Sequence, residues 1–258
     1  MAMVDITTVD IAATMSTELK YNSGRLVAVL ACGMGVFLLF LSVPRVLTFA
    51  YLAKMPPQVT RALKVGVTFP QAMLSEAESG YADAAFILPG DGLIQQDLGR
   101  LVLRQAELLR EFPDQRQEML LAISSHFRAS IAAAPSRAFP WVLEAYVRME
   151  MSAPPEEVSD LLRMSYFLGP HEGSNLLLRM RVACRMWEQL DADVQDYMRD
   201  DFREIWRYTA FRRQLIEIYL DASLPVRSII RGAILNNEQD KHYFNSLLLK
   251  AVRVQPPS

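Results

Sequence analysis

The chain has 258 residues, of which 51% are hydrophobic and 22% are charged, and its formal net charge is −2. This balance excludes wholesale disorder and gives no overall electrostatic basis for binding nucleic acid. The two cysteines, Cys32 and Cys184, lie in parts of the chain that we expect to be separate, so the sequence predicts no disulfide framework.

An uncharged, apolar stretch covers residues 26–43, and apolar residues resume after Arg45. A helix that crosses a bilayer core of about 30 Å needs roughly 20 apolar residues. The run is longer than the roughly 7–15 apolar residues of a cleaved secretory signal, and acidic residues precede it. We therefore expect an uncleaved transmembrane anchor over residues 25–54, in which Gly33 and Gly35 are candidates for packing against another membrane helix.

The remainder of the chain divides around this anchor. Residues 1–24 mix Thr, Ala, Ser and Asp without a firm helical period, and we expect a flexible or weakly helical N-terminal tail there. Two consecutive prolines end the helix that precedes them, so residues 55–69 are expected to form a linker. A repeat-like α-helical domain is expected over residues 70–253, followed by a C-terminal tail over residues 254–258.

Positively charged residues flank the anchor on both sides. Lys20 and Arg25 precede it, whereas Arg45, Lys54 and Arg61 follow it. Cytoplasmic segments near a membrane helix carry the excess of Lys and Arg, but long domains are translocated largely regardless of charge. Charge alone therefore leaves open which side of the membrane holds the helical domain.

Beyond residue 70, apolar residues recur at helical spacing and turn signals separate the periodic stretches. The expected helices cover residues 71–80, 81–88, 93–112, 116–133, 137–151, 156–168, 172–190, 193–222, 226–235 and 239–252. The sequence shows no alternating strand pattern of useful length. The predicted fold class is therefore all-α, with one N-terminal transmembrane helix followed by a helical-hairpin, tetratricopeptide-like domain.

The turns of this domain recur with a period. Pro135 and Pro170 are 35 residues apart, with two expected helices between them. Tetratricopeptide repeats are helix–turn–helix units of about 34 residues that end in Pro. Within the unit, the pattern's Trp and first small residue match Trp141 and Ala145, and the later large and small residues match Leu162 and Ser165.

The following unit departs from the pattern, since Leu176 replaces the Trp and Met180 replaces the small residue. An irregular helical bundle is the alternative. A repeat array would expose a concave face that binds another chain.

The sequence contains no motif of a known catalytic or metal centre. His126, His171 and His242 stand alone, and nucleophile elbows, phosphate loops and dinucleotide motifs are absent. We therefore expect no enzyme activity, no cofactor and no metal. The acidic residues between positions 191 and 201 are interpreted as a solvated helix face rather than as a catalytic pair. A glycan-acting enzyme that used Asp200 and Asp201 beside a Trp is a further hypothesis.

Arginine and aromatic residues cluster in two expected helices and are candidates for an interaction surface, because a guanidinium stacks on aromatic rings and binds anions. The candidate interaction residues are Arg179, Arg185, Trp187, Arg203, Trp206 and Arg207. In the alternative interpretation, the arginines pair with acids at short helical spacing, among them Asp200, Asp201, Glu204 and Glu188, while both tryptophans lie in the core.

The segment over residues 134–187 reads AP-SRAFPWVLEAYVRM and then LLRMSYFLGPHEGSNLLLRMRVACRMW. Its Pro-Trp helix, its S-x-x-x-G-P-x-E turn (Ser165, Gly169, Pro170 and Glu172) and its Arg-rich helix ending at Trp187 resemble the VpsP-like proteins of bacterial exopolysaccharide clusters. The resemblance covers about a third of the chain. It implies an accessory role in polysaccharide production or export, with the helical domain on the periplasmic side of the inner membrane.

The leading hypothesis is therefore a non-enzymatic, single-pass protein of the bacterial inner membrane that acts as a scaffold or adaptor for an envelope assembly, such as one for exopolysaccharide. The expected partners are the lipid bilayer and other membrane or envelope proteins, with a polysaccharide as a further candidate and no nucleic acid. The alternative is a permanent structural subunit of another large membrane complex, of the energy-transducing or secretion type.

Overall fold

The computed structural model describes residues 6–56, 59, 71–109 and 111–254, without the side chains of residues 6–26, 71–72, 174 and 253–254. Every regular element within these ranges is a helix, and no strand occurs there, which confirms the predicted all-α class. The chain divides into two compact units, Met1–Met55 and Pro56–Ser258. The parts of the expected linker at residues 57–58 and 60–69, and the expected tail at 255–258, lie outside the described residues.

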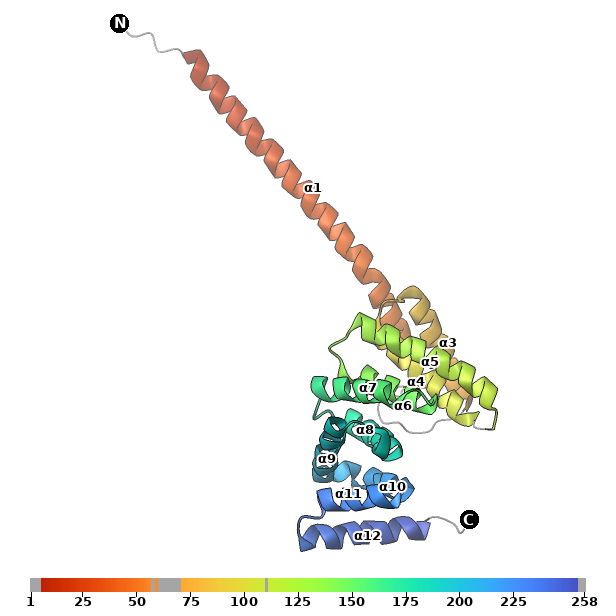
Figure 1. Ribbon diagram of the computed structural model, residues 1–258. Coiled ribbons are helices and arrows are strands. Elements are labelled where there is room, and N and C mark those ends of the chain that lie inside the picture. The colour runs from red at the N-terminus through yellow and green to blue at the C-terminus, as the bar shows by residue number, and fades with distance from the viewer. Residues whose placement is uncertain (1–5, 57–58, 60–70, 110, 255–258) are drawn as a thin grey trace. The chain divides into compact units, whose positions relative to one another are not determined.

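The first unit contains a single long helix, α1 (Ile6–Leu52) (Figure 1). Its segment Val27–Leu52 is long and apolar enough to cross a membrane. The most apolar part of this segment is not buried against other parts of the described structure. The helix continues through Pro44. A proline removes one backbone hydrogen bond, but membrane helices tolerate it where local adjustments satisfy the freed carbonyl.

Helix α1 also extends further toward the N-terminus than we expected. It begins at Ile6, inside the segment over residues 1–24 for which the sequence predicted a flexible or weakly helical tail, separate from the anchor. The physical reason is cooperativity: once the apolar segment has formed a helix, each added residue gains a hydrogen bond without a new nucleation cost. The segment also lacks proline up to Pro44, so no residue stops this extension.

The second unit is built from consecutive helices (Figure 1). In chain order, the α-helices are α3 (Gln71–Ile87), α4 (Gly92–Leu108), α5 (Pro113–Ala133), α6 (Ala138–Glu150), α7 (Pro155–Leu168), α8 (Gly173–Met186), α9 (Ala192–Arg207), α10 (Arg212–Asp221), α11 (Leu224–Ile234) and α12 (Glu238–Val254). Two short 3₁₀ turns, η1 (Trp187–Gln189) and η2 (Thr209–Phe211), follow α8 and α9.

These helices pair as hairpins that stack in chain order. Helix α4 packs on α5, α6 on α7, and α8 on α9. The first helices of successive hairpins also lie together, α6 beside α8 and α8 beside α10, as do the second helices, α7 beside α9 and α9 beside α11. Contacts mainly between neighbouring hairpins define a repeat array, so the predicted helical-hairpin domain is confirmed.

Three prolines mark the starts of three hairpins. Pro89, Pro135 and Pro170 each lie three residues before the first residue of α4, α6 and α8. The sequence revealed only the second and third, because the first hairpin is longer: α4 and α5 have 17 and 21 residues, whereas α6 and α7 have 13 and 14. A fixed period of about 34 residues therefore misses the first unit.

Small residues allow the paired helices to approach closely. Ala145 and Ser165, which match the small residues of the repeat pattern, are fully buried, as is Leu162 at the pattern's large position. In the first hairpin, Gly99 has the corresponding role, because a Cβ atom there would lie 2.7 Å from a ring carbon of Phe127. In both hairpins, therefore, a residue without a large side chain lies buried at the corresponding position of the first helix.

Two expected helix boundaries are wrong. Helix α3 continues through the glycine at position 80, where we expected two short helices, since a glycine inside a helix costs only about 1 kcal/mol and packing against α4 offsets it. The single helix expected over 193–222 is divided at Tyr208, whose backbone is extended. The side chain of Arg212 donates to the carbonyl oxygen of Trp206 at 2.7 Å and so satisfies the end of α9.

Candidate functional site

Arg179 is not a surface residue, which corrects its assignment as a candidate interaction residue. Its side chain is fully buried, and it binds Asp201 in two places, Nε to Oδ2 at 2.6 Å and Nη2 to Oδ1 at 3.0 Å. The remaining donors contact the carbonyl oxygens of Ser165, Gly169 and Pro170 at 2.9–3.2 Å. Arg179 therefore caps the C-terminal end of α7 and fixes it to α9, where helix carbonyls otherwise lack partners.

The two candidate tryptophans also lie in the core, with exposed fractions of 6% for Trp187 and 5% for Trp206. Trp187 stacks on Phe202, and Trp206 donates from Nε1 to a carboxylate oxygen of Asp240 at 2.9 Å. Neither ring forms an exposed stacking platform. This confirms the alternative interpretation, in which both tryptophans are core residues.

The other three candidate arginines are exposed and form ion pairs. Arg203 pairs with Asp200 and Arg207 pairs with Glu204, in each case three residues earlier on α9. Arg185 instead pairs with Glu150 on α6, not with the nearby Glu188. Asp200 and Asp201, the two acids named in the glycan-acting enzyme hypothesis, are both bound by arginines, Asp200 by Arg203 and Asp201 by Arg179.

Gly33 and Gly35 lie on an exposed part of α1, and a Cβ atom added at either would meet nothing within 4 Å. Their role in packing against another membrane helix stays a prediction. Among the residues that the structure describes, no group of three or more His, Cys, Asp or Glu side chains is arranged to hold a metal ion.

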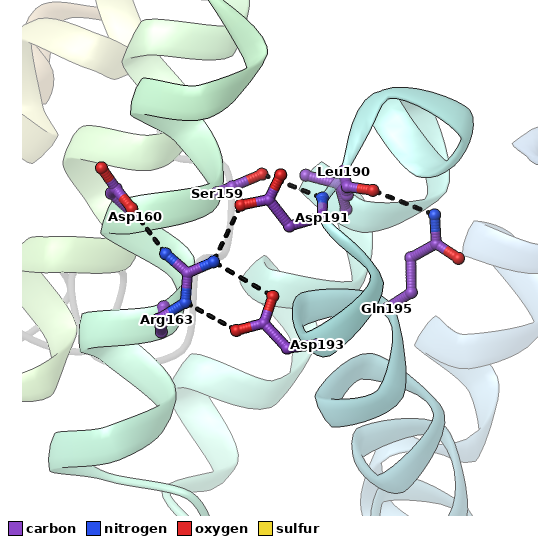
Figure 2. A network of polar contacts seen from close by, with 7 residues as sticks. All are labelled: Ser159, Asp160, Arg163, Leu190, Asp191, Asp193 and Gln195. Atoms are coloured by element: carbon purple, nitrogen blue, oxygen red, sulfur yellow. Dashed lines mark hydrogen bonds and ion pairs between the residues drawn. The ribbon is translucent and has the colours of Figure 1, made fainter.

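Arg163 organises the acidic residues near the start of α9 (Figure 2). It donates to Asp193 through Nε at 2.7 Å and Nη2 at 3.0 Å, and to Asp191 through Nη2 at 2.8 Å, while Nη1 binds Asp160. Hydrogen bonds from Arg163 lower the pKa of Asp193 below its ordinary value. The single positive charge of Arg163 is thus shared by three carboxylates, so the surface formed by these four residues has a net negative charge.

A cavity of about 370 Å³ lies between α5, α6 and α7. Helix α6 supplies Trp141, Glu144 and Arg148, which face the same side because they are three and four residues apart. Arg128 of α5, Glu157 and Asp160 of α7, and apolar residues of both helices complete the lining. The cavity is the best candidate for a functional site, because it combines an aromatic ring, two guanidiniums and three carboxylates.

Glu144 belongs to the lining of this cavity and is 1% exposed. Its Oε1 atom accepts hydrogen bonds from Ser124 Oγ at 2.8 Å, Arg128 Nε at 3.2 Å and Arg148 Nε at 2.8 Å. Its buried Oε2 atom has no hydrogen-bond partner among the described residues. Burial raises the pKa of Glu144, and the hydrogen bond from Ser124 and the charge of Arg128 oppose that effect.

Sequence reasoning did not identify this cavity. Trp141 was assigned only to the repeat pattern, and its Nε1 in fact donates to the carbonyl oxygen of Pro135 at 3.0 Å, which fixes the indole at the hairpin turn. The available signal was the spacing of Trp141, Glu144 and Arg148 on one face of α6. Sequence spacing places these three together, but it does not show that residues of α5 and α7 line the same cavity.

A second cavity, of about 460 Å³, lies between α10 and α12. Apolar residues such as Ile216, Leu220 and Leu247 contribute to its lining, with Arg213 and Lys250 among the charged ones. No described buried polar atom of its lining residues lacks a hydrogen-bond partner. It therefore gives less information about a ligand than the cavity beside Glu144.

The sequence matches no model of a known protein family and no curated protein.

Proposed function

We propose that this chain is a non-enzymatic, membrane-anchored helical adaptor that binds other proteins of a bacterial envelope assembly. The observation that carries the proposal is the combination of an apolar helix able to span a bilayer with an array of stacked helical hairpins. An array of this kind presents extended surfaces to other chains, and the anchor would hold those surfaces beside the membrane.

We further propose the process and the membrane in which this adaptor acts. The segment over residues 134–187, which resembles VpsP-like proteins, supports exopolysaccharide biosynthesis or export as the process that the adaptor serves. In this setting the anchor lies in the inner membrane and the helical domain lies in the periplasm. The buried pair of Arg179 and Asp201 joins the turn of this segment to α9, so the quoted turn is part of the hairpin stack.

The test of this function is the polymer itself. We expect deletion of the chromosomal gene to reduce the exopolysaccharide of the producing cells several-fold, and a plasmid copy of the full chain to restore it. A copy with Asp200→Ala, which breaks only an exposed ion pair, should also restore polymer, because the adaptor uses no acidic catalyst. Unchanged polymer in the deletion strain would contradict the proposed role.

The orientation has its own test. Ser136 is exposed at the turn before α6, whereas Cys184 is buried and Cys32 lies in the anchor. In spheroplasts, a membrane-impermeant maleimide should therefore label the Ser136→Cys variant strongly and the parent chain weakly. Labelling of Ser136→Cys only after lysis would place the helical domain in the cytoplasm and contradict the periplasmic proposal.

The second candidate function is a permanent subunit of a large membrane complex. Gly33 and Gly35 favour it, because an added Cβ at either glycine meets nothing in this chain and the exposed helix leaves room for another membrane helix to approach. Substitution of both by Leu would then release the chain from its complex. Under the adaptor proposal the same substitution leaves the helical domain and its partners unaffected.

A further inference from the structure

We propose that the cavity between α5, α6 and α7 receives the guanidinium of an arginine from a partner chain. The inference rests on the proposed adaptor function and names the chemistry of the partner at one site. It is based on three independent observations: an unpaired buried acceptor, an excess of carboxylates and a fixed aromatic ring.

The first observation is the Oε2 atom of Glu144. It is buried and without a hydrogen-bond partner among the described residues, although the carboxylate belongs to the cavity lining. Buried polar atoms in folded proteins almost always have partners, because an unpaired one costs about 1–3 kcal/mol and more when charged. An N–H donor from outside the chain would remove this cost.

The second observation is the charge around the cavity. Three carboxylates belong to the lining, those of Glu144, Glu157 and Asp160, against two guanidiniums. The ion pairs of Arg163 extend the same surface from Asp160 to Asp191 and Asp193 on α9 (Figure 2). Five carboxylates are thus balanced by three arginines, so this surface attracts a cation rather than an anion.

The third observation is Trp141. Its ring belongs to the cavity lining, and its Nε1 atom is already used by the carbonyl oxygen of Pro135. The indole therefore offers its ring rather than a donor. Tryptophan is the side chain on which a cation stacks best, and arginine stacks more often than lysine because its guanidinium is planar and weakly hydrated.

A neutral sugar is the rival ligand, since sugars also use aromatic rings and carboxylates. The charge excess favours the cation, because a neutral ligand would leave two negative charges uncompensated. A guanidinium also has several N–H donors in one plane and accepts no hydrogen bonds, which suits a site whose unpaired atom is an acceptor. We therefore assign the site to arginine, and the sugar becomes one outcome of the test.

The test uses the full chain in detergent or nanodiscs, labelled with 5-fluorotryptophan. The chain has three tryptophans, so its ¹⁹F spectrum contains three signals, and Trp141→Phe assigns one of them. The probes are N-acetyl-arginine amide, its neutral isostere N-acetyl-citrulline amide, and cellobiose. We expect the arginine probe to shift the Trp141 signal alone, because Trp187 and Trp206 are buried elsewhere.

Two variants test the named carboxylates. Glu144→Gln should weaken arginine binding about tenfold, the effect of one lost charge-assisted hydrogen bond. Glu157 is a half-exposed residue of the lining, so Glu157→Gln should weaken binding about twofold. This variant keeps the test valid if Glu144→Gln fails to fold. The matched control is Glu150→Gln. Glu150 lies on α6, as Glu144 does, and is also paired with an arginine, but it does not line the cavity, so this variant should leave arginine binding unchanged.

The outcomes separate the inference from the proposed function. Equal shifts with arginine and citrulline, or no effect of either carboxylate variant, would overturn the guanidinium site. A Trp141 shift with cellobiose but not with arginine would overturn it as well and identify a glycan site. None of these results concerns the polymer phenotype, which tests the adaptor function independently.

Discussion

At the scale of single residues, the most informative group is the fully buried guanidinium of Arg179. A charge in the interior is tolerated only if it is paired and its donors are satisfied. Asp201 and three backbone carbonyl oxygens at the end of α7 provide those partners. The sequence places Arg179 in an arginine-rich helix but gives no sign that it points inward, because its partners come from two other elements.

We predict that Arg179→Met lowers the free energy of unfolding by about 3–5 kcal/mol, because it leaves the carboxylate of Asp201 buried without a counter-ion. The double variant Arg179→Met with Asp201→Leu should recover part of this loss, because it removes the unpaired carboxylate but leaves the three carbonyl oxygens at the end of α7 without their donor. Urea unfolding followed by tryptophan fluorescence measures both. The control Arg203→Met breaks only an exposed pair and should cost no more than about 1 kcal/mol. Equal losses in the single and double variants would contradict the account.

A second residue-scale prediction concerns Asp193. Arg163 lowers its pKa in the folded protein, so the pair stabilises the fold above the ordinary carboxyl pKa of about 3.9, and this contribution is lost as the pH falls through the lowered value. In a carboxyl ¹³C NMR titration, Arg163→Gln should move the Asp193 midpoint upward toward the ordinary value. Arg199→Gln, whose partner is Asp196, should leave it unchanged. An unchanged midpoint in Arg163→Gln would show that the pair does not act in solution.

At the scale of helices, close contact within the hairpins depends on residues without large side chains. Gly99 in α4 lies against Phe127 of α5, and Gly169 after α7 lies against Ala138 of α6. In contrast, Gly232 of α11 has open space around it. Packing therefore requires a glycine at positions 99 and 169 but not at position 232, and the sequence alone does not distinguish these positions.

We predict opposite effects for two glycine substitutions. Gly99→Ala should destabilise the protein by about 1–3 kcal/mol, because the new Cβ atom would lie 2.7 Å from a ring carbon of the buried Phe127. Gly232→Ala should stabilise it by about 0.5–1 kcal/mol, because alanine loses less backbone entropy in an exposed helix. Thermal unfolding by circular dichroism compares the two, and destabilisation of the same size in both would be inconsistent with the packing described.

Much of the element order was predictable from the sequence, because Pro135 and Pro170 mark hairpin starts directly and apolar residues recur at helical spacing. The break between α9 and α10 was not predictable, since it depends on the side chain of Arg212 reaching the carbonyl of Trp206. The cavity was missed for a similar reason. Glu144 carries no distinctive motif, and only the packing of α5 and α7 against α6 reveals its unpaired oxygen.

At the scale of the whole molecule, an exposed apolar helix and a packed helical unit require different surroundings. The large apolar side chains between residues 27 and 47 are exposed, whereas the helical unit has its own core, which includes Phe202 and Phe244. An exposed apolar surface of this extent is unfavourable in water. A bilayer would remove that cost, so the exposed apolar surface of α1 is consistent with a single membrane span.

We predict that the full chain with an N-terminal tag stays in the membrane pellet after alkaline carbonate extraction and keeps its tag. Phe37→Arg combined with Phe40→Arg should release it or prevent its insertion, because each arginine near the centre of a span costs about 2.5–3.5 kcal/mol. Phe86→Arg changes an exposed phenylalanine of α3, outside the apolar segment, and should leave the chain in the pellet. Loss of the tag from the parent chain would instead identify a cleaved signal sequence.

The most direct test of the adaptor account is the native mass of the tagged chain after mild detergent extraction from its own membranes, with identification of the proteins that co-elute. The account predicts a monomer or small oligomer, together with a minor, dissociable fraction bound to a protein of polysaccharide assembly. A single large species of fixed stoichiometry would contradict it, and would make the chain a permanent subunit of another membrane complex.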